Sequence, residues 1–434
     1  MIRNKVFIIL LLIGLVTVFG CDDRGTNVPT RSSRKMGIDP NRNSPIANPA
    51  LNFQVFNPEG VLQMAVYAPL EAFTTNAQPM PFLVLLAPEN ENKFYYTDHG
   101  LVELVEELIA SGEIEPMSIA MVGNDQIFGG YFYANSYPGG RYDDVLGPAL
   151  FRQLQGFIGF PIIDAPNKRA IGGVGQGAYG AFRAAIMNPG YYGAVVTGDG
   201  PLDFDGATGS GGIIPLFSDV FTEQGLAINS SAIYSSFDSS FTRPVSMFLL
   251  GGALAFSPHD TNIEFDTVSL RDTIIGTDTF SFDIDYPITN NRNDPAFIIT
   301  DSSTLVESVL TGDVSRNDFN FDFHLPFNPD ASPNSVIWPL WMANNLDALE
   351  AQNPGALSGT NCWIGTTTEG SFGPWKTYGE QTKSWIATLN SISVKSVSTR
   401  NYKGYGGFPA TRDEYVYDLM REMLIFADSS TFKK

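Results

Sequence analysis

The chain has 434 residues, and its 46 acidic and 26 basic side chains give a formal net charge of -20 at pH 7. Such an acidic surface argues against nucleic acid and against anionic lipid surfaces as partners, because both repel it. The length and the hydrophobic content of 43% are ample for a large core, so the chain fits one large domain or two small ones.

The start of the chain carries the clearest motif. A basic start precedes an apolar run, residues 6–19, that is shorter than the roughly 20 residues of a membrane-spanning helix. The run leads into V-F-G-C at residues 18–21, the lipobox pattern, in which the thiol of Cys21 takes a diacylglyceryl group. We therefore expect residues 1–21 to be a lipoprotein signal peptide and Cys21 to anchor the chain to a membrane of the cell envelope, on its periplasmic or surface side. The alternative is a short signal anchor with an incidental cysteine.

The rest of the chain divides into a linker and a folded part. Residues 22–50 are rich in Asn, Pro, Ser and Arg and show no apolar periodicity, which predicts a flexible tether. Residues 51–430 are expected to form a single domain. Lipidation of Cys21 would leave Cys362 without a disulfide partner, and its apolar surroundings predict an inert core residue.

Strand-like and helix-like segments alternate along the folded part. In chain order the pattern predicts strands at 62–67 and 82–86, a helix at 101–109, a strand at 117–122, a helix at 144–157, a strand at 169–173, a helix at 179–187, strands at 193–197 and 362–365, a helix at 377–389, a strand at 394–399 and a helix at 413–426. This alternation implies crossover connections, and so an α/β fold with a mostly parallel central sheet and helices on both faces.

The pattern loosens between about residues 206 and 345, where Ser, Asp, Thr and Asn are dense. We expect a long insertion there, placed over the carboxyl edge of the sheet, where open α/β sheets bind ligands.

The most informative stretch is residues 169–183, in which a strand enters a glycine-rich turn and leaves as a helix. This is the layout of a nucleophile elbow, G-x-S-x-G, whose central serine sits at the helix N-terminus. Residues 173–177 read G-V-G-Q-G, so Gly175 stands in the place of the serine.

Several segments beside the elbow resemble one family in the same order along the chain. They are residues 101–112, 130–144 (G-Y-F-Y-A-N-S-Y-P-G-G-R-Y-D-D), 188–203, 255–258 (A-F-S-P) and 337–341 (I-W-P-L-W). Together with the elbow they resemble the esterase D-like esterases of the α/β-hydrolase superfamily, which include feruloyl-esterase-like members. The resemblance implies an α/β-hydrolase fold and carboxylic-ester hydrolysis as the activity of the family.

The catalytic residues of the family do not carry over to this chain. Its nucleophile falls on Gly175, and its oxyanion sequence L-L-H-G is replaced by L-L-A-P, in which Pro88 has no N–H to donate. Its acid, in a G-T-x-D turn, corresponds at best to Glu369, about one position off. The loop at residues 402–410, where the family has its histidine, contains none. An acyl-enzyme needs a nucleophilic oxygen or sulfur with a base in reach, so these losses predict impaired catalysis.

A glycine at the elbow would leave an N–H-lined concavity at a helix N-terminus, which can bind an anion or a carbonyl. We therefore expect Gly175, Gln176, Ala87 and Trp338 to bind a ligand, with a small-molecule ester or a carbohydrate as candidates and no cofactor. The remaining tryptophans are expected to belong to the core rather than to a ligand platform.

Three histidines occur, at positions 99, 259 and 324. His259 and His324 lie in the insertion and are weak candidates for a relocated base, whereas His99 is expected to be a surface or cap residue. No clustered ligands at metal-site spacing are present, so no metal is expected.

Three hypotheses follow. The first is an exported esterase-like lipoprotein with impaired catalysis, which binds a ligand or a partner through the former active-site cleft. The second is an active carboxylic-ester hydrolase with a displaced nucleophile, identifiable by a serine hydroxyl within hydrogen-bond reach of His259 or His324. The third is a structural envelope component with no small-molecule site, identifiable by a cleft filled by insertion side chains.

Overall fold

The computed structural model describes residues 51–57, 60–73, 78–124, 130, 132–135, 142–151, 162–163, 165–206, 211–234, 243–257, 264–275, 278–288, 324–367, 373–403 and 413–432, with the backbone alone for 51–63 and 264–288. The expected signal peptide and tether lie outside these residues, as do Cys21, His259 and Glu369.

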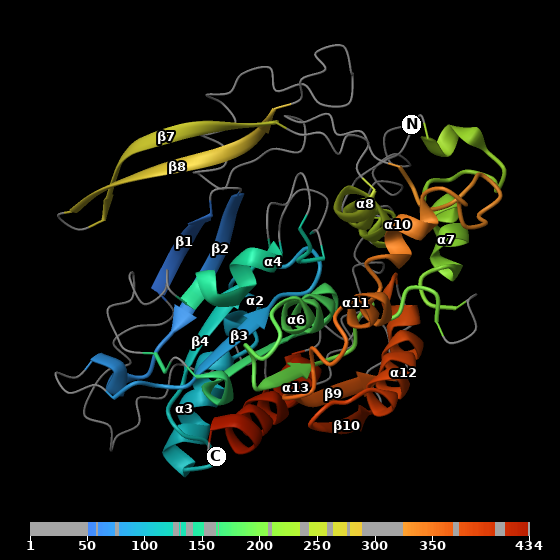
Figure 1. Ribbon diagram of the computed structural model, residues 1–434. Coiled ribbons are helices and arrows are strands. Elements are labelled where there is room, and N and C mark those ends of the chain that lie inside the picture. The colour runs from blue at the N-terminus through green and yellow to red at the C-terminus, as the bar shows by residue number, and fades with distance from the viewer. Residues whose placement is uncertain are drawn as a thin grey trace, which may run out of the picture. The chain divides into compact units, whose positions relative to one another are not determined.

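Eight strands form one mixed sheet (Figure 1). In the order of their hydrogen bonding they are β1 (Leu51–Asn57), β2 (Gly60–Tyr67), β4 (Ser118–Val122), β3 (Phe82–Leu86), β5 (Arg169–Gly173), β6 (Ala194–Thr197), β9 (Asn361–Thr367) and β10 (Ser396–Tyr402). Strand β2 is antiparallel to both of its neighbours, and all pairs from β4 to β10 are parallel. Strands β3 and β4 are buried at every residue, as expected of parallel strands covered on both faces.

Helices follow or separate the strands along the described chain. They are α2 (Tyr95–Asp98), α3 (Leu101–Ser111), α4 (Tyr142–Asp144), α6 (Gln176–Met187), α7 (Pro215–Glu223), α8 (Pro244–Phe256), α10 (Trp338–Met342), α11 (Leu346–Gln352), α12 (Trp375–Ser391) and α13 (Asp413–Ala427). A separate hairpin consists of β7 (Glu264–Ile275) and β8 (Asp278–Ile288).

Two adjacent glycines of β5 show that helices cover both faces of the sheet. Successive residues of a strand point to opposite faces. A Cβ atom on Gly172 would meet Met423 of α13, whereas one on Gly173 would meet the backbone of α6. Helix α13 also packs on α3, and α11 packs on both α6 and α12 (Figure 1). The predicted fold class is therefore confirmed: the strand order, the layers and the strand–turn–helix elbow after β5 are those of an α/β-hydrolase.

One predicted helix, at residues 144–157, is wrong in its bounds. Helix α4 begins at Tyr142, and the chain kinks within Val145–Ala149, where Leu146 and Gly147 leave helical geometry just before Pro148. Proline lacks the N–H that an uninterrupted helix needs, and its ring clashes with the preceding turn. Residues 152–157 lie outside the described residues.

The insertion contains regular structure that the sequence pattern did not predict, namely α7, α8, α10 and the β7–β8 hairpin. We call α7, α8, α10 and residues 224–234 and 324–337 the insertion lobe. Phe248 and Phe256 of α8 contact Phe132, which follows β4, and Phe256 contacts Phe204, which follows β6. Helix α8 therefore lies over the carboxyl ends of these strands, as predicted for the insertion.

Candidate functional site

The elbow has the backbone shape of a nucleophile turn without a nucleophile. Gly175, between β5 and α6, has φ 60° and ψ -130°, and its N–H donates to the carbonyl of Asp199 at 2.7 Å. Residues with a side chain rarely adopt this conformation. Two residues on, a Cβ atom at Gly177 would lie 2.1 Å from the carbonyl oxygen of Leu86, so glycine is needed for α6 to pack against β3.

The space above Gly175 is filled by a carboxylate of the same chain. The N–H of Gln176, the first residue of α6, donates to Oε2 of Glu89 at 3.0 Å. A Cβ atom added at Gly175 would lie 2.3 Å from that oxygen. The concavity that the sequence led us to expect as open is therefore occupied, because a helix N-terminus stabilises a negative charge and Glu89 supplies one.

Glu89 is held by neutral groups. The hydroxyl of Tyr378 donates to its other oxygen, Oε1, at 2.7 Å, and Pro88 and Trp375 pack around the same position. The side chain is 6% exposed. Burial raises the pKa of Glu89, and the hydrogen bonds from Gln176 and Tyr378 oppose that shift in part. We call Glu89, with Gly175, Gln176, Trp375 and Tyr378, the elbow plug.

Two residues that we expected to bind a ligand are engaged by the protein itself. The buried side-chain oxygen of Gln176 accepts hydrogen bonds from the amide of Asn124 at 3.0 Å and from the N–H of Phe132 at 3.3 Å. The N–H of Ala87 donates to Val122 at 2.9 Å, and its carbonyl accepts from the hydroxyl of Tyr133 at 2.8 Å. These contacts make the floor of the site a set of internal hydrogen bonds.

The tryptophan at the elbow differs from the one that we expected there. Trp375 would be 3.2 Å from a Cβ atom at position 175. Trp338 instead lies in the insertion lobe, where its ring packs edge-on against Phe217 with centroids 5.5 Å apart.

The insertion supplies a buried serine close to His324, but the contact is with the main chain. Oγ of Ser257 donates to the carbonyl of His324 at 2.6 Å and accepts from the indole N–H of Trp341 at 3.1 Å. The side chain of His324 is exposed. His99 caps a turn, since its Nδ1 lies 2.7 Å from the carbonyl oxygen of Tyr95.

Asp199 is a second buried carboxylate at the elbow, and the sequence analysis did not single it out. Its Oδ2 accepts hydrogen bonds from the N–H of Thr367 at 2.5 Å and from the hydroxyl of Thr367 at 2.6 Å. Burial raises its pKa to about 6, although these hydrogen bonds oppose the shift. Asp199 thus joins the elbow to the end of β9, directly before the segment that carries Glu369.

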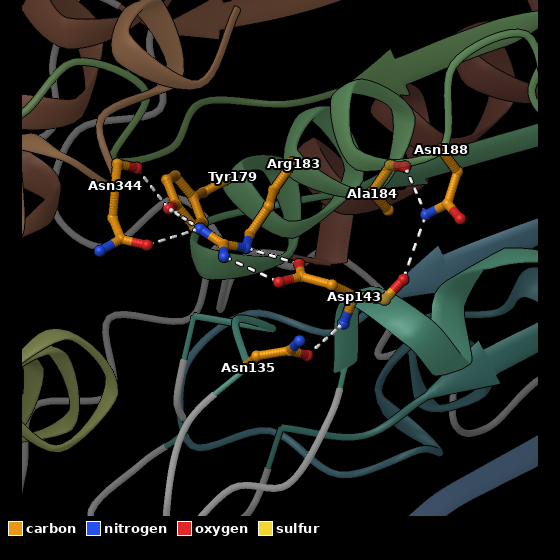
Figure 2. Close-up of polar contacts among 7 residues, drawn as sticks. All are labelled: Asn135, Asp143, Tyr179, Arg183, Ala184, Asn188 and Asn344. Carbon is orange, nitrogen blue, oxygen red and sulfur yellow. Dashed lines mark hydrogen bonds and ion pairs between the residues drawn. The ribbon is translucent and has the colours of Figure 1, made fainter. Parts of the chain in front are cut away.

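A buried ion pair fixes the other end of α6 (Figure 2). The guanidinium of Arg183 meets both carboxylate oxygens of Asp143, at 2.6 and 2.8 Å. It also donates to Asn344 at 2.9 Å, next to the insertion lobe, and to the hydroxyl of Tyr179 at 3.2 Å. This cluster, which we call the α6 clamp, joins helix α4, helix α6 and the chain after α10.

Comparisons with known proteins give similarity in structure alone. No family model matches the chain, and no curated protein matches it. Among solved structures, a ferulic acid esterase is 12% identical with a TM-score of 0.47, over 88% of this chain and 98% of that one. The S-formylglutathione hydrolase of Agrobacterium tumefaciens is 10% identical with a TM-score of 0.47, over 88% and 94%. MPT51 of Mycobacterium tuberculosis is 14% identical with a TM-score of 0.42, over 89% and 99%.

Other site chemistry is sparse in the part of the chain that the structure describes. No group of three or more His, Cys, Asp or Glu side chains there could hold a metal ion. No helix among the same residues is long and apolar enough to cross a membrane. Cys362 is buried, as expected of a core residue, and burial raises the pKa of its thiol to about 12.

Proposed function

We propose that this chain is a non-hydrolytic protein with an esterase-like fold, exported and held in the cell envelope by a lipid on Cys21, which acts by binding a ligand or a partner. The elbow plug carries this proposal. Where an esterase would have its nucleophile, the chain has Gly175, and a carboxylate lies against the position that a serine side chain would occupy.

The plug works against ester hydrolysis in two ways. The N–H of Gln176 occupies the position that follows the nucleophile, and in α/β-hydrolases that N–H stabilises the oxyanion of the acyl intermediate. Here it already donates to Glu89. When it is ionised, the same carboxylate would also repel an approaching oxyanion, because like charges at close range in a buried site disfavour each other.

The plug also limits where a ligand can bind. An ester or a carboxylate would have to displace Glu89 to reach the N–H of Gln176, and this would leave one carboxylate without its hydrogen bond. Recognition therefore falls to surfaces away from that N–H, which favours a partner over a small ester among the ligands that we considered.

The test is ester hydrolysis by the full mature chain on short-chain aryl esters, together with labelling by a fluorophosphonate. We expect neither turnover nor label. Gly175→Ser alone should also stay unlabelled, because the plug is still present and the catalytic histidine is still absent. Gly175→Ser combined with Glu89→Gly removes the plug, so this variant tests the effect of the absent histidine by itself.

Turnover by the native chain would overturn the proposal. Mass spectrometry of the labelled peptide would then locate the nucleophile, with Ser257→Ala as the first variant to compare. The anchor is tested separately, since the N-terminal peptide of the mature chain should carry a lipid mass on Cys21 that is lost in Cys21→Ser.

A further inference from the structure

The insertion lobe presents an exposed apolar face. Among the described residues, the large apolar side chains that are exposed are Val336 (72%), Ile228 (47%), Leu340 (46%) and Met187 (38%). The first three belong to the insertion lobe. Val336 lies two residues before α10 and Leu340 lies within it, and the half-buried Trp338 is between them in the chain. We call Ile228, Val336, Trp338 and Leu340 the apolar face.

The two segments that form this face are uncharged and adjacent. Residues 331–346 contain no charged side chain between Asp330 and Asp347, and neither do residues 224–234. Next to Ile228, the N–H of Asn229 donates to the carbonyl of Pro329 at 2.6 Å, and the exposed carboxylate of Asp330 follows directly before the second segment. In a chain of net charge -20, exposed Val, Ile and Leu in segments without charged side chains mark a place where burial removes apolar area from water and desolvates few carboxylates.

We propose that the apolar face docks onto the lipid bilayer that holds the anchor, with Trp338 at the level of the headgroups. Tryptophan and aliphatic side chains are the residues that proteins place at this depth, and segments without charged side chains can enter it at low cost. Docking requires a zwitterionic bilayer surface, since an anionic one would repel the rest of the domain.

The expected tether supports this choice of occupant, and the inference rests on the proposed lipid anchor at Cys21. A flexible chain over residues 22–50 has a root-mean-square length of about 30 Å. The domain would therefore stay close to the bilayer, and docking would be an intramolecular step that a small apolar face can drive.

The test uses the lipidated mature chain in phosphatidylcholine vesicles whose acyl chains carry bromine, a quencher of tryptophan fluorescence. The other four tryptophans are at most 5% exposed, so quenching should come from Trp338 and disappear in Trp338→Phe. We expect quenching of the native chain and its loss in Val336→Asp and in Leu340→Asp. Met187→Asp is the matched control, because it places the same charge at an exposed apolar position outside the lobe and should keep the quenching.

Each other outcome overturns the inference in a distinguishable way. A chain that floats with the vesicles but is not quenched keeps its anchor and does not dock. A chain that neither floats nor carries a lipid mass on Cys21 refutes the anchor proposal and docking with it. Quenching that survives Val336→Asp, together with a dimer in vesicle-free solution that the same substitution dissociates, would show that a second copy covers this face.

Discussion

Helix α6 is bordered by two buried carboxylates that are held in opposite ways. In the clamp, Asp143 faces the guanidinium of Arg183 through two hydrogen bonds. In the elbow plug, Glu89 receives hydrogen bonds from an amide N–H and a phenol, both neutral. A buried carboxylate that faces a cation stays ionised, whereas one without a cation favours its neutral form. The clamp is thus a buried ion pair, while the plug is a carboxylate whose pKa is raised by burial.

The two carboxylates therefore have different roles. The clamp ties α6 to neighbouring segments, and four hydrogen bonds from the Arg183 guanidinium go to side chains of the protein itself, so its role is stability. The plug occupies the place where an esterase of this fold would perform catalysis, so its main effect is on what the site can bind.

The largest effect is expected from breaking the clamp. Arg183→Met leaves Asp143 buried without its cation, which should lower the free energy of unfolding by about 3–5 kcal/mol in urea denaturation. Arg400→Met is the control, because its ion pair with Glu422 is exposed and should contribute about 0–1 kcal/mol. Equal losses in the two variants would show that the clamp is no stronger than a surface pair.

The next effect concerns crowding at the elbow. Gly175 and Gly112 both have positive φ, 60° and 74°, so alanine at either position strains the backbone, and more at Gly175 because its ψ of -130° lies outside the left-handed helical region. A Cβ atom at Gly112 meets nothing within 4 Å, whereas one at Gly175 meets Glu89. We expect Gly175→Ala to cost about 2–4 kcal/mol of unfolding free energy and Gly112→Ala about 1–2 kcal/mol.

A double variant tests whether the extra loss of unfolding free energy in Gly175→Ala comes from its contact with Glu89. Adding Glu89→Gly to Gly175→Ala should bring the loss back toward that of Gly112→Ala in the same urea experiment. If Gly175→Ala cost no more than Gly112→Ala, the carboxylate would not be packed against position 175.

The alternation of strands and helices in the sheet could be predicted from the sequence, because strands buried on both faces are short continuous apolar runs and helix ends carry glycine signals. Helix α3, for example, ends at Gly112 in the left-handed conformation, as its sequence indicates. Helix α8 could not be found this way, since every residue from Val245 to Phe256 is buried and an all-apolar helix has no polar face to mark its period.

The glycine at the elbow could be predicted from the sequence, but the carboxylate that occupies the space above it could not. The sequence alone shows that Gly175 lacks a hydroxyl. The carboxylate that fills the space belongs to Glu89, directly after the L-L-A-P sequence. Only the fold brings it to the elbow, because its hydrogen bond with Gln176 joins residues 87 positions apart in the sequence. The sequence feature that could have indicated the plug is an acidic residue in the oxyanion loop, one position after Pro88. The role of Asp199 was harder to predict, because nothing in the neighbouring sequence indicates that its side chain contacts Thr367.

Asp199 predicts a pH dependence of stability. Its pKa rises from 3.8 to about 6 on folding, so the folded chain binds the proton more tightly than the unfolded chain does. The stabilisation from that proton is complete below pH 3.8 and is lost as the pH rises through about 6, by up to about 3 kcal/mol. Asp199→Asn should flatten the unfolding free energy over this range. An unchanged slope in the variant would show that other groups dominate there.

The smallest effect, and the most direct test of the plug, is expected from Glu89→Gln. The amide keeps the shape of the side chain and an oxygen for the N–H of Gln176, so the unfolding free energy should change by about 1 kcal/mol or less under mildly acidic conditions. Because burial raises the pKa of Glu89, the native chain should lose stability relative to the variant as the pH rises through that raised value. The measurement is the difference between native and variant unfolding free energies from about pH 4 to about pH 8. The opposite sign, with the native chain gaining on the variant, would mean that the helix N-terminus and the Tyr378 hydroxyl outweigh burial. Glu89 would then be a carboxylate bound at the elbow as firmly as Asp143 is in the clamp.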